Sequence, residues 1–485
     1  MVYIQGTDRS QTMLLPASIE DYVTQENPVR AIDAFVETLD LCELGFTVAG
    51  ANLKGGRPRY HPSVLLKLYL WGYFARIRSS RRLKEACNSN LNAIWITGNL
   101  APDHSTISDF RKNNTKALKS IFRQFNLICI DLNLFGRELI AIDGTFIKAV
   151  NSKSRSFTKS KLQKLIKQID TKVDEYLEHL ELSDCETQLK EDSTGLQKKI
   201  EKLKVKNKRY KELLEDCEKT STGQVNLTDP ESRQLKKRGS HTVGYNVQSA
   251  VDEKHHLMAS CEVTNHPTDH HLLHQISQQA KEDLSLDAKA PLEVLADTGY
   301  HDSSELSKCG TDNTTTYVPG QKTRLPGDGS VTNAQFIHHP ESDTYECPNG
   351  KHLPRKADDI RSAGRGYRVY FDYKLCRGCP LLKRCTKGKY RKFKINFHHE
   401  TLSANAKRLK ENPKFYRKRA ALVEHPFGTI KDWNGRRDLL CRGIELAAVE
   451  TRLSAFTYNF KRVLKLIGLN DLMSAINTRQ LTYGN

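Results

Sequence analysis

The chain has 485 residues, 38% of them hydrophobic, and a formal net charge of +19 at pH 7. At roughly 150 residues per domain, this length predicts two or three domains. No apolar run approaches the roughly 18 residues of a membrane-spanning helix, and the N-terminus lacks the basic-then-apolar order of a signal peptide, so we expect a cytoplasmic protein with no membrane partner. The positive charge favours a polyanionic partner, because Lys and Arg that neutralise phosphates release condensed counterions.

The basic residues concentrate in two segments. Residues 51–90 carry nine Lys or Arg against one acid, and residues 351–400 carry fifteen against four. A soluble basic protein without a polyanionic partner would not need to group its basic residues in this way. We therefore expect two separate basic surfaces.

Residues 1–130 are predicted to form a helical domain. Helical spacing of apolar residues marks HPSVLLKLYLWGYFARI, and two shorter helical segments follow, SSRRLKEACNSN and APDHSTISDFRKNN, the second capped at Asp103 or Ser105. Arginines including Arg57 and Arg59 surround the turns. This pattern is typical of a helix-turn-helix-like DNA-binding domain, although a helical domain with a solvated basic face fits it too.

Residues 158–220 are predicted to form an antiparallel coiled-coil hairpin with a structural or interaction role. Apolar residues recur at alternating steps of four and three in two segments joined by ELSDCETQLKEDSTG, and Asn207 would be a polar residue that fixes the register. The heptad positions are Leu162, Ile166, Ile169, Val173, Tyr176 and Leu180, then Leu196, Ile200, Leu203, Asn207, Tyr210, Leu214 and Cys217.

Strand patterns before and after this hairpin predict an α/β core with a mixed sheet, over residues 137–335 and 398–470. LIAIDGTFIKAV reads as a buried strand, and GYNVQSAVD and HLMASCEVTN read as a hairpin. A helix, DHHLLHQISQQAKEDL, precedes the strand LEVLADTGY and the short strand TTTYVPG. The histidines in NHPTDHHLLH are assigned no role. The amphipathic segment GIELAAVETRLSAFTYNFKRVLKLIG is expected to pack on this core.

Three acids stand out in the core. Asp143 lies at the centre of the first strand, where an unpaired carboxylate is costly to bury unless it is paired or binds a cation. Asp297 ends a second strand, and Glu424 lies in a helical stretch. Each alone could be a cap or an ion-pair partner. Together they are hard oxygen ligands suited to two Mg²⁺ ions, about 4 Å apart, that support in-line phosphoryl displacement.

The sequence resembles the DDE transposases of bacterial insertion sequences, of the YREK-signature type. The similarity lies in AIDGTFIKA, ADTGYHDS and FYRKRAALVEHPFGTIK, and in GRPRYHPSVLLKLYLWGY and PDHSTISDFRK of the N-terminal region. The resemblance implies an RNase H-like catalytic domain in which Asp143, Asp297 and Glu424 hold two Mg²⁺ ions, or Mn²⁺ in their place. It implies cleavage at element ends, strand transfer into target DNA, a homodimer or higher synaptic assembly, and a location at the bacterial nucleoid.

The signature residues Tyr, Arg and Lys map to Tyr416, Arg419 and Lys431, which the resemblance assigns to DNA binding. Four residues separate Arg419 from Glu424, where the signature has three. On an ideal helix Arg419 then projects about 140° away from Glu424. Lys431 would be a point charge for a phosphate near the cleavage site, or else a solvated surface lysine.

Residues 336–397 are predicted to form a Cys-rich basic β insertion. The strand-like segments GYRVYFDYK and RKFKINFHH flank LCRGCPLLKRC, and ECPNG precedes them. The C-x₂-C pair with two further cysteines allows a tetrahedral zinc site, with free structural thiols as the alternative and an iron–sulfur cluster less favoured. The candidate ligands are Cys347, Cys376, Cys379 and Cys385.

Two other functions fit the same residues. One is a DNA-binding repressor derived from a transposase and without catalytic activity. The other is a structure-specific nuclease that shares the catalytic fold but never rejoins strands. The leading prediction from the sequence is a Mg²⁺-dependent DNA transposase.

Overall fold

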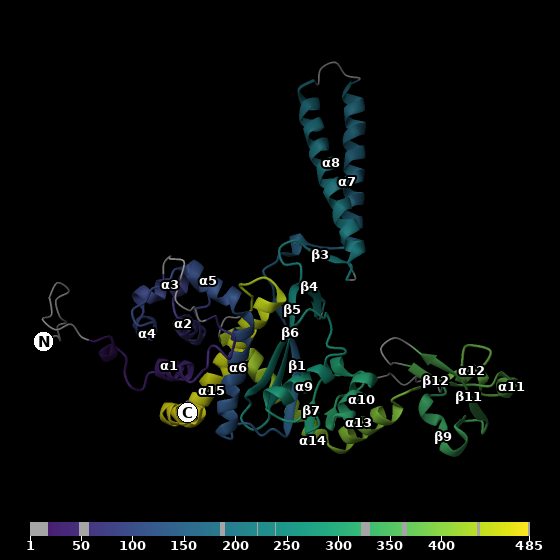
Figure 1. The fold of residues 1–485 in the computed structure, drawn as a ribbon. Helices are drawn as coiled ribbons and strands as arrows, with labels where there is room; N and C mark the ends of the chain where they lie inside the picture. The colour runs from purple at the N-terminus through teal and green to yellow at the C-terminus, as the bar shows by residue number, and fades with distance from the viewer. Residues whose placement is uncertain are drawn as a thin grey trace, which may run out of the picture.

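The computed structural model has four parts (Figure 1). N-terminal helices lie on one side of a central mixed sheet, a long helical hairpin projects from the sheet, and a small β lobe lies on the side away from the N-terminal helices. Among the described residues, none of the helices is both long and apolar enough to cross a membrane. The structure describes residues 18–47, 58–184, 190–220, 222–237, 239–321, 330–360, 366–433 and 437–483.

The N-terminal part is helical, as predicted, but it does not have a hydrophobic core of its own. Phe35 of the first helix stacks on Phe456 of the C-terminal helix, with ring centroids 5.6 Å apart, and Phe125 packs edge-on against Phe456 at 5.1 Å. One continuous core therefore joins the N-terminal helices to the central sheet across the boundary predicted at residue 130. The helices are α1 (Val29–Glu37), α2 (Pro62–Phe74), α3 (Ser80–Ser89), α4 (Leu91–Ile96), α5 (His104–Asn113) and α6 (Thr115–Asp131).

The central sheet has six strands, with β1 in the middle. β1 pairs antiparallel with β5 on one side and parallel with β7 on the other, and β8 continues parallel to β7. β4 and β6 each pair antiparallel with a different half of β5. This mixed sheet fits an RNase H-like core. The strands are β1 (Leu139–Lys148), β4 (Arg233–Lys237), β5 (Ser240–Asp252), β6 (Met258–Thr264), β7 (Leu292–Leu295) and β8 (Thr314–Tyr317).

The two faces of β1 are covered by different helices. Because successive side chains of a strand point to opposite faces, Ile140 and Ile142 join the large core, whereas Leu139 and Ala141 pack under α14. This buries both faces and explains the almost continuous apolar run at the start of β1. The helices that follow the sheet strands are α9 (Leu273–Asp283), α10 (Ser303–Thr311), α13 (His399–Glu411), α14 (Pro413–Gly428) and α15 (Ile444–Tyr483).

The helical hairpin consists of α7 (Lys159–Asp184) and α8 (Lys190–Lys219) (Figure 1). Its base is tied to the protein by the short strands β2 (Ser156–Thr158) and β3 (Gln224–Asn226). Asn207 donates a hydrogen bond to Asp170 of the other helix, which agrees with its predicted role in setting the register. Leu162 and Cys217 are buried near the base, while Leu177 is exposed, so the hairpin is packed best where it joins the core.

The Cys-rich lobe is a five-stranded antiparallel sheet with two short helices. Its small core contains Phe336, Tyr345, Leu353, Tyr370 and Phe393, and Val331 packs against it, ahead of the predicted boundary at residue 336. The elements are β9 (Ile337–His339), β10 (Thr344–Glu346), β11 (His352–Ile360), β12 (Gly366–Tyr370), β13 (Phe393–Asn396), α11 (Tyr373–Cys376) and α12 (Leu382–Cys385).

Candidate active site

Asp143 and Asp297 lie at the same level of two neighbouring parallel strands. The register pairs Ala141 of β1 with Leu295 of β7. Two residues further along come Asp143, within β1, and Asp297, just past the end of β7 in extended backbone, and Arg419 lies within 4 Å of both carboxylates. Sheet pairing therefore brings together two acids that are 154 residues apart in the chain (297 − 143).

Helix α14 covers this face of the sheet. Its residues Leu422 and Val423 pack against Leu139, Ala141 and Leu295, which fixes the rotation of the helix. One turn earlier, Arg419 is directed at the acids. Its Nη2 lies 3.0 Å from Oδ1 of Asp143 and 3.8 Å from Oδ2 of Asp297.

Burial governs the ionisation of Asp143, whose side chain is 25% exposed. Loss of hydration raises the pKa of this carboxyl above its ordinary value, Arg419 counteracts the rise, and the negative charges of Asp297 and Asp269 add to it. One guanidinium thus does not compensate the negative charge of the site. A divalent cation would supply what is lacking.

Two more residues that the resemblance assigns to DNA binding lie near the acids. The hydroxyl of Tyr416 donates to the carbonyl oxygen of Ala296 at 3.3 Å, next to Asp297. Lys431 follows α14 in a π-helical turn, Thr429–Trp433, and its Nζ donates to Oγ1 of Thr145. Thr145 lies two residues beyond Asp143 and so on the same face of β1.

Glu424 does not join the two aspartates. The residue is exposed on α14, on the other side of the helix from Leu422 and Val423, and the five-residue step from Arg419 rotates it by about 140°. Among the described residues, Asp143, Asp297 and Glu424 do not form a group whose carboxylate oxygens all lie within 4.8 Å of one another. With Arg419 turned inward, Glu424 is turned outward, and its metal-binding role stays a prediction.

Sequence reasoning missed a third aspartate at the site, Asp269. It lies in the connection between β6 and α9, and its Oδ1 accepts hydrogen bonds of 2.8 Å from both Asn246 and Gln248 of β5. It lies so close to Gly144 that a Cβ there would come within 2.5 Å of the same oxygen. Asp269 is the first residue of the helix predicted from the sequence, whereas α9 begins only at Leu273, so only the two polar residues at alternate positions of β5 could have signalled it.

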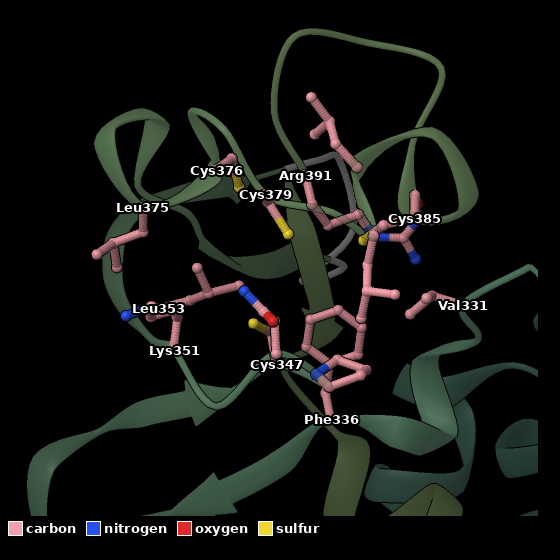
Figure 2. Close-up of a pocket in the computed structure, with 14 residues that line it drawn as sticks. Val331, Phe336, Cys347, Lys351, Leu353, Leu375, Cys376, Cys379, Cys385 and Arg391 are labelled. Carbon is pink, nitrogen blue, oxygen red and sulfur yellow. Dashed lines mark hydrogen bonds between the residues drawn. The ribbon is translucent and has the colours of Figure 1, made fainter.

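The four cysteines of the lobe surround one cavity (Figure 2). Cys376 ends α11, Cys385 ends α12, Cys379 lies between the two helices, and Cys347 follows β10. The cavity has a volume of about 30 Å³, close to the space of one water molecule. It is otherwise lined largely by apolar side chains, including Phe336, Leu353 and Leu375.

The thiols are not at zinc-binding distances. A tetrahedral zinc site with Zn–S bonds of about 2.3 Å requires sulfur atoms roughly 3.8 Å apart. Among the described residues, no three of the four thiols lie within 4.8 Å of one another. All four are free rather than disulfide-bonded. Binding a metal would therefore need a small inward movement of the turns that carry them.

The group that does meet the 4.8 Å limit among the described residues is His339, Glu346 and His352. Nε2 of His339 lies 2.9 Å from Oε2 of Glu346, an ordinary ion-pair geometry, and His352 is exposed. These contacts explain the grouping without a metal ion.

A surface groove of about 630 Å³ lies in the N-terminal part. Arg59 and Tyr60 line it together with Lys84 of α3 and Asp109 of α5. Asp103 caps α5, as one of the two predicted caps, by accepting from the backbone N–H of Ser105 at 3.1 Å. Arg59 is thus placed beside the predicted DNA-binding helices, whereas Arg57 falls outside the described residues.

Comparison with protein families decides the class of the protein. A family described as a transposase domain matches residues 17–113, and a family described as a transposase DDE domain matches residues 346–464. The chain belongs to the DDE transposases of insertion sequences. No curated protein and no solved structure gave a match.

The two matches divide the transposase in an informative way. The first covers α1 to α5, including the basic segment at Arg59. The second begins at Glu346 and runs through the Cys-rich lobe, Glu424 and Lys431 into α15. The lobe is therefore part of the matched DDE region. Asp143 and Asp297 lie outside both matches, and sheet register alone brings them together.

Proposed function

We propose that this transposase cleaves DNA at the ends of an insertion sequence and joins those ends to target DNA, using divalent metal ions held at Asp143 and Asp297. The observation that carries the proposal is the alignment of these carboxylates on neighbouring parallel strands, with Arg419 between them. The work would take place on DNA at the bacterial nucleoid, in the cytoplasm. The YREK subtype is part of the proposal.

The donor set suits Mg²⁺ or Mn²⁺. Carboxylate oxygens are the ligands that these ions prefer. Ser249, the cross-strand partner of Asp143 on β5, is fully buried, and within the described ranges its Oγ has no hydrogen-bond partner. Asp143 and Asp297 would hold the ions, with Glu424 as the third ligand that the family resemblance implies. Bound ions would activate a water or a 3′-hydroxyl and stabilise the leaving oxygen.

The cationic side chains around the acids would position the DNA strand. Lys431, on the same face of β1 as Asp143, supplies a point charge for a phosphate. Arg419 presents a planar guanidinium, 16% exposed, which can rotate from Asp143 to a phosphate while staying at the site. Tyr416 fixes the backbone at Ala296 and so the direction in which Asp297 projects.

Two outlying surfaces would bind the DNA duplex. In the N-terminal part, Arg59 and the exposed Arg81 and Arg82 of α3 lie on the basic segment, and Arg57 belongs to the same proposal. In the Cys-rich lobe we propose a structural Zn²⁺ at Cys347, Cys376, Cys379 and Cys385, which would hold together a lobe with a small core. Two transposase copies, or a larger assembly, would hold the two element ends.

The test is an assay on labelled element ends with Mg²⁺. The proposal expects nicks that leave 3′-hydroxyl groups, followed by products in which these ends are joined to a target duplex. Cleavage without joining would identify a structure-specific nuclease instead. Binding without cleavage, at any Mg²⁺ or Mn²⁺ concentration, would identify a repressor.

A further inference from the structure

Asp269 is held in place by a buried chain of hydrogen bonds. Asn246 and Gln248 point from alternate positions of β5 to the same oxygen, Oδ1, each at 2.8 Å, and both residues are completely buried. The Oε1 of Gln248 in turn accepts from the hydroxyl of Tyr300, which is also completely buried. Burying several polar groups is costly unless each is hydrogen-bonded, so this chain fixes the carboxylate rigidly.

The other oxygen of Asp269 is left open. In the part of the chain that the structure describes, Oδ2 accepts none of the hydrogen bonds made to this carboxylate, since Asn246 and Gln248 both donate to Oδ1. Oδ2 faces the turn that carries the second strand acid. A Cβ added at Gly299 would lie 3.5 Å from this oxygen and 2.9 Å from Oδ1 of Asp297.

Two glycines make this approach possible. Gly144 directly follows Asp143, and Gly299 lies two residues after Asp297. A Cβ at Gly144 would lie 2.5 Å from Oδ1 of Asp269, well inside van der Waals contact, and would displace the carboxylate. The backbone just after each of the two acids, in β1 and after β7, thus lacks a side chain where Asp269 comes close to it.

A separate feature points to a ligand beside Asp143, on the face of β5 opposite to that of Asn246 and Gln248. Ser249 lies directly opposite Asp143 in the antiparallel pair, so the two side chains project to the same face. Ser249 is completely buried, and its Oγ has no hydrogen-bond partner among the described residues. A buried hydroxyl left in this way beside Asp143 is a polar atom that a group bound at the site would satisfy.

We propose that Asp269 is a third acidic residue of the metal site, one that strengthens divalent-cation binding at Asp143 and Asp297 by its fixed negative charge. This inference rests on the proposed function. Among the described residues, these three acids do not bring one carboxylate oxygen each to within 4.8 Å of one another, so in this arrangement Asp269 would act from the rim of the site. It is a positioning residue for the cation.

The test is Mn²⁺ binding to the full-length protein without DNA, measured by electron paramagnetic resonance. Asp269→Asn is the decisive variant, because the Asn oxygen can still accept from Asn246 and Gln248 while the charge is lost. We expect about tenfold weaker Mn²⁺ binding with an unchanged melting temperature, since one unit charge at this range is worth on the order of 1.4 kcal/mol after solvent screening. Asp287→Asn, an exposed position ahead of β7, is the matched control and should bind Mn²⁺ as the wild type does.

A cleavage assay gives the second readout. For Asp269→Asn, the Mg²⁺ concentration at half-maximal cleavage should rise about tenfold, while the rate at saturating Mg²⁺ recovers. If Asp143→Asn weakens Mn²⁺ binding and Asp269→Asn does not, the inference is wrong and the proposed function stands. If neither variant changes Mn²⁺ binding, or the wild type binds none, the metal site itself is wrong.

Discussion

Arg419 of α14 donates a hydrogen bond from Nη2 to Oδ1 of Asp143 at 3.0 Å, and the same nitrogen lies 3.8 Å from Oδ2 of Asp297. The guanidinium therefore occupies the space between the two carboxylates where a divalent cation would be attracted most strongly. In the free protein, Arg419 partly neutralises the acids. A metal ion that binds there has to compete with this positive charge.

Replacing Arg419 should make metal binding tighter. We expect Arg419→Gln to bind Mn²⁺ several-fold more tightly than the wild type by calorimetry, because the competing charge is gone, and to cleave DNA more slowly because a phosphate contact is lost. Arg417→Gln is the matched control, since Arg417 is exposed on the same helix. Weaker Mn²⁺ binding by Arg419→Gln would show that Arg419 orders the carboxylates rather than competing with the ion.

Asp143 should lower the stability of the metal-free protein at neutral pH. Burial raises the pKa of this carboxyl above its ordinary value of 3.8, so its charged form is less favourable in the folded than in the unfolded chain. We expect Asp143→Asn to raise the free energy of unfolding at pH 7 while abolishing cleavage. The gain should shrink as the pH falls through the raised pKa and vanish below about 3.8.

Urea denaturation at several pH values, without divalent ions, measures this difference. Asp131→Asn is a control, because Asp131 is a surface acid that pairs with Arg479 at 2.9 Å. Removing its charge should leave the stability of the protein unchanged or lower it. A loss of stability for Asp143→Asn at pH 7 would mean that the Arg419 ion pair outweighs the cost of burial.

Glu424 should matter for cleavage but not for metal binding by the free protein. Because α14 turns it away from Asp143, we expect Glu424→Gln to bind Mn²⁺ as the wild type does in the absence of DNA, whereas Asp297→Asn binds it more weakly. Both variants should lose cleavage and keep DNA binding, since the proposed function includes a third ligand once DNA is bound. Wild-type cleavage by Glu424→Gln would remove this residue from the site.

The sequence contained enough information to predict the framework of the site. Alternating and continuous apolar runs indicated β1 and β7. Asp143, at the centre of the first strand, indicated a bound cation or an ion-pair partner, because an unpaired buried carboxylate is costly. The angular separation of Arg419 and Glu424 was also predictable, because the extra residue before Glu424 sets it on the helix. Which of the two faces inward was not predictable, since that depends on Leu422 and Val423 packing under the sheet.

Long-range polar contacts were beyond sequence reasoning. The position of the Asp269 carboxylate depends on hydrogen bonds from Asn246 and Gln248. The role of these two residues can be recognised only once β5 is known to pair with β1. The core that the N-terminal helices share with the central sheet could not be predicted for a similar reason, because it joins residues that are far apart in the sequence. Helix α15 is apolar on several sides, and the sequence could not show that Phe456 would face Phe35 as well as the sheet.

The Cys-rich lobe should contain about one zinc ion per chain. Its core of five buried side chains is small, so a metal that links Cys347 to the two short helices would contribute much of its stability. Elemental analysis should show loss of zinc in a Cys376→Ser, Cys379→Ser double variant and full retention in Cys42→Ser, which replaces an exposed cysteine elsewhere. A folded wild type that contains no zinc after purification without chelators would leave the four residues as structural thiols.

The N-terminal basic surface should dominate the salt dependence of DNA binding. Each phosphate contact contributes roughly one unit to the slope of log affinity against log salt concentration, so Arg81→Ala with Arg82→Ala should lower that slope by about two. Both side chains are exposed on α3, where truncation costs little packing. Lys204→Ala with Lys208→Ala removes equal charge from exposed positions of the helical hairpin and should leave the slope unchanged. Equal changes in both double variants would mean that the hairpin also contacts the DNA backbone, and that binding follows total charge rather than this surface.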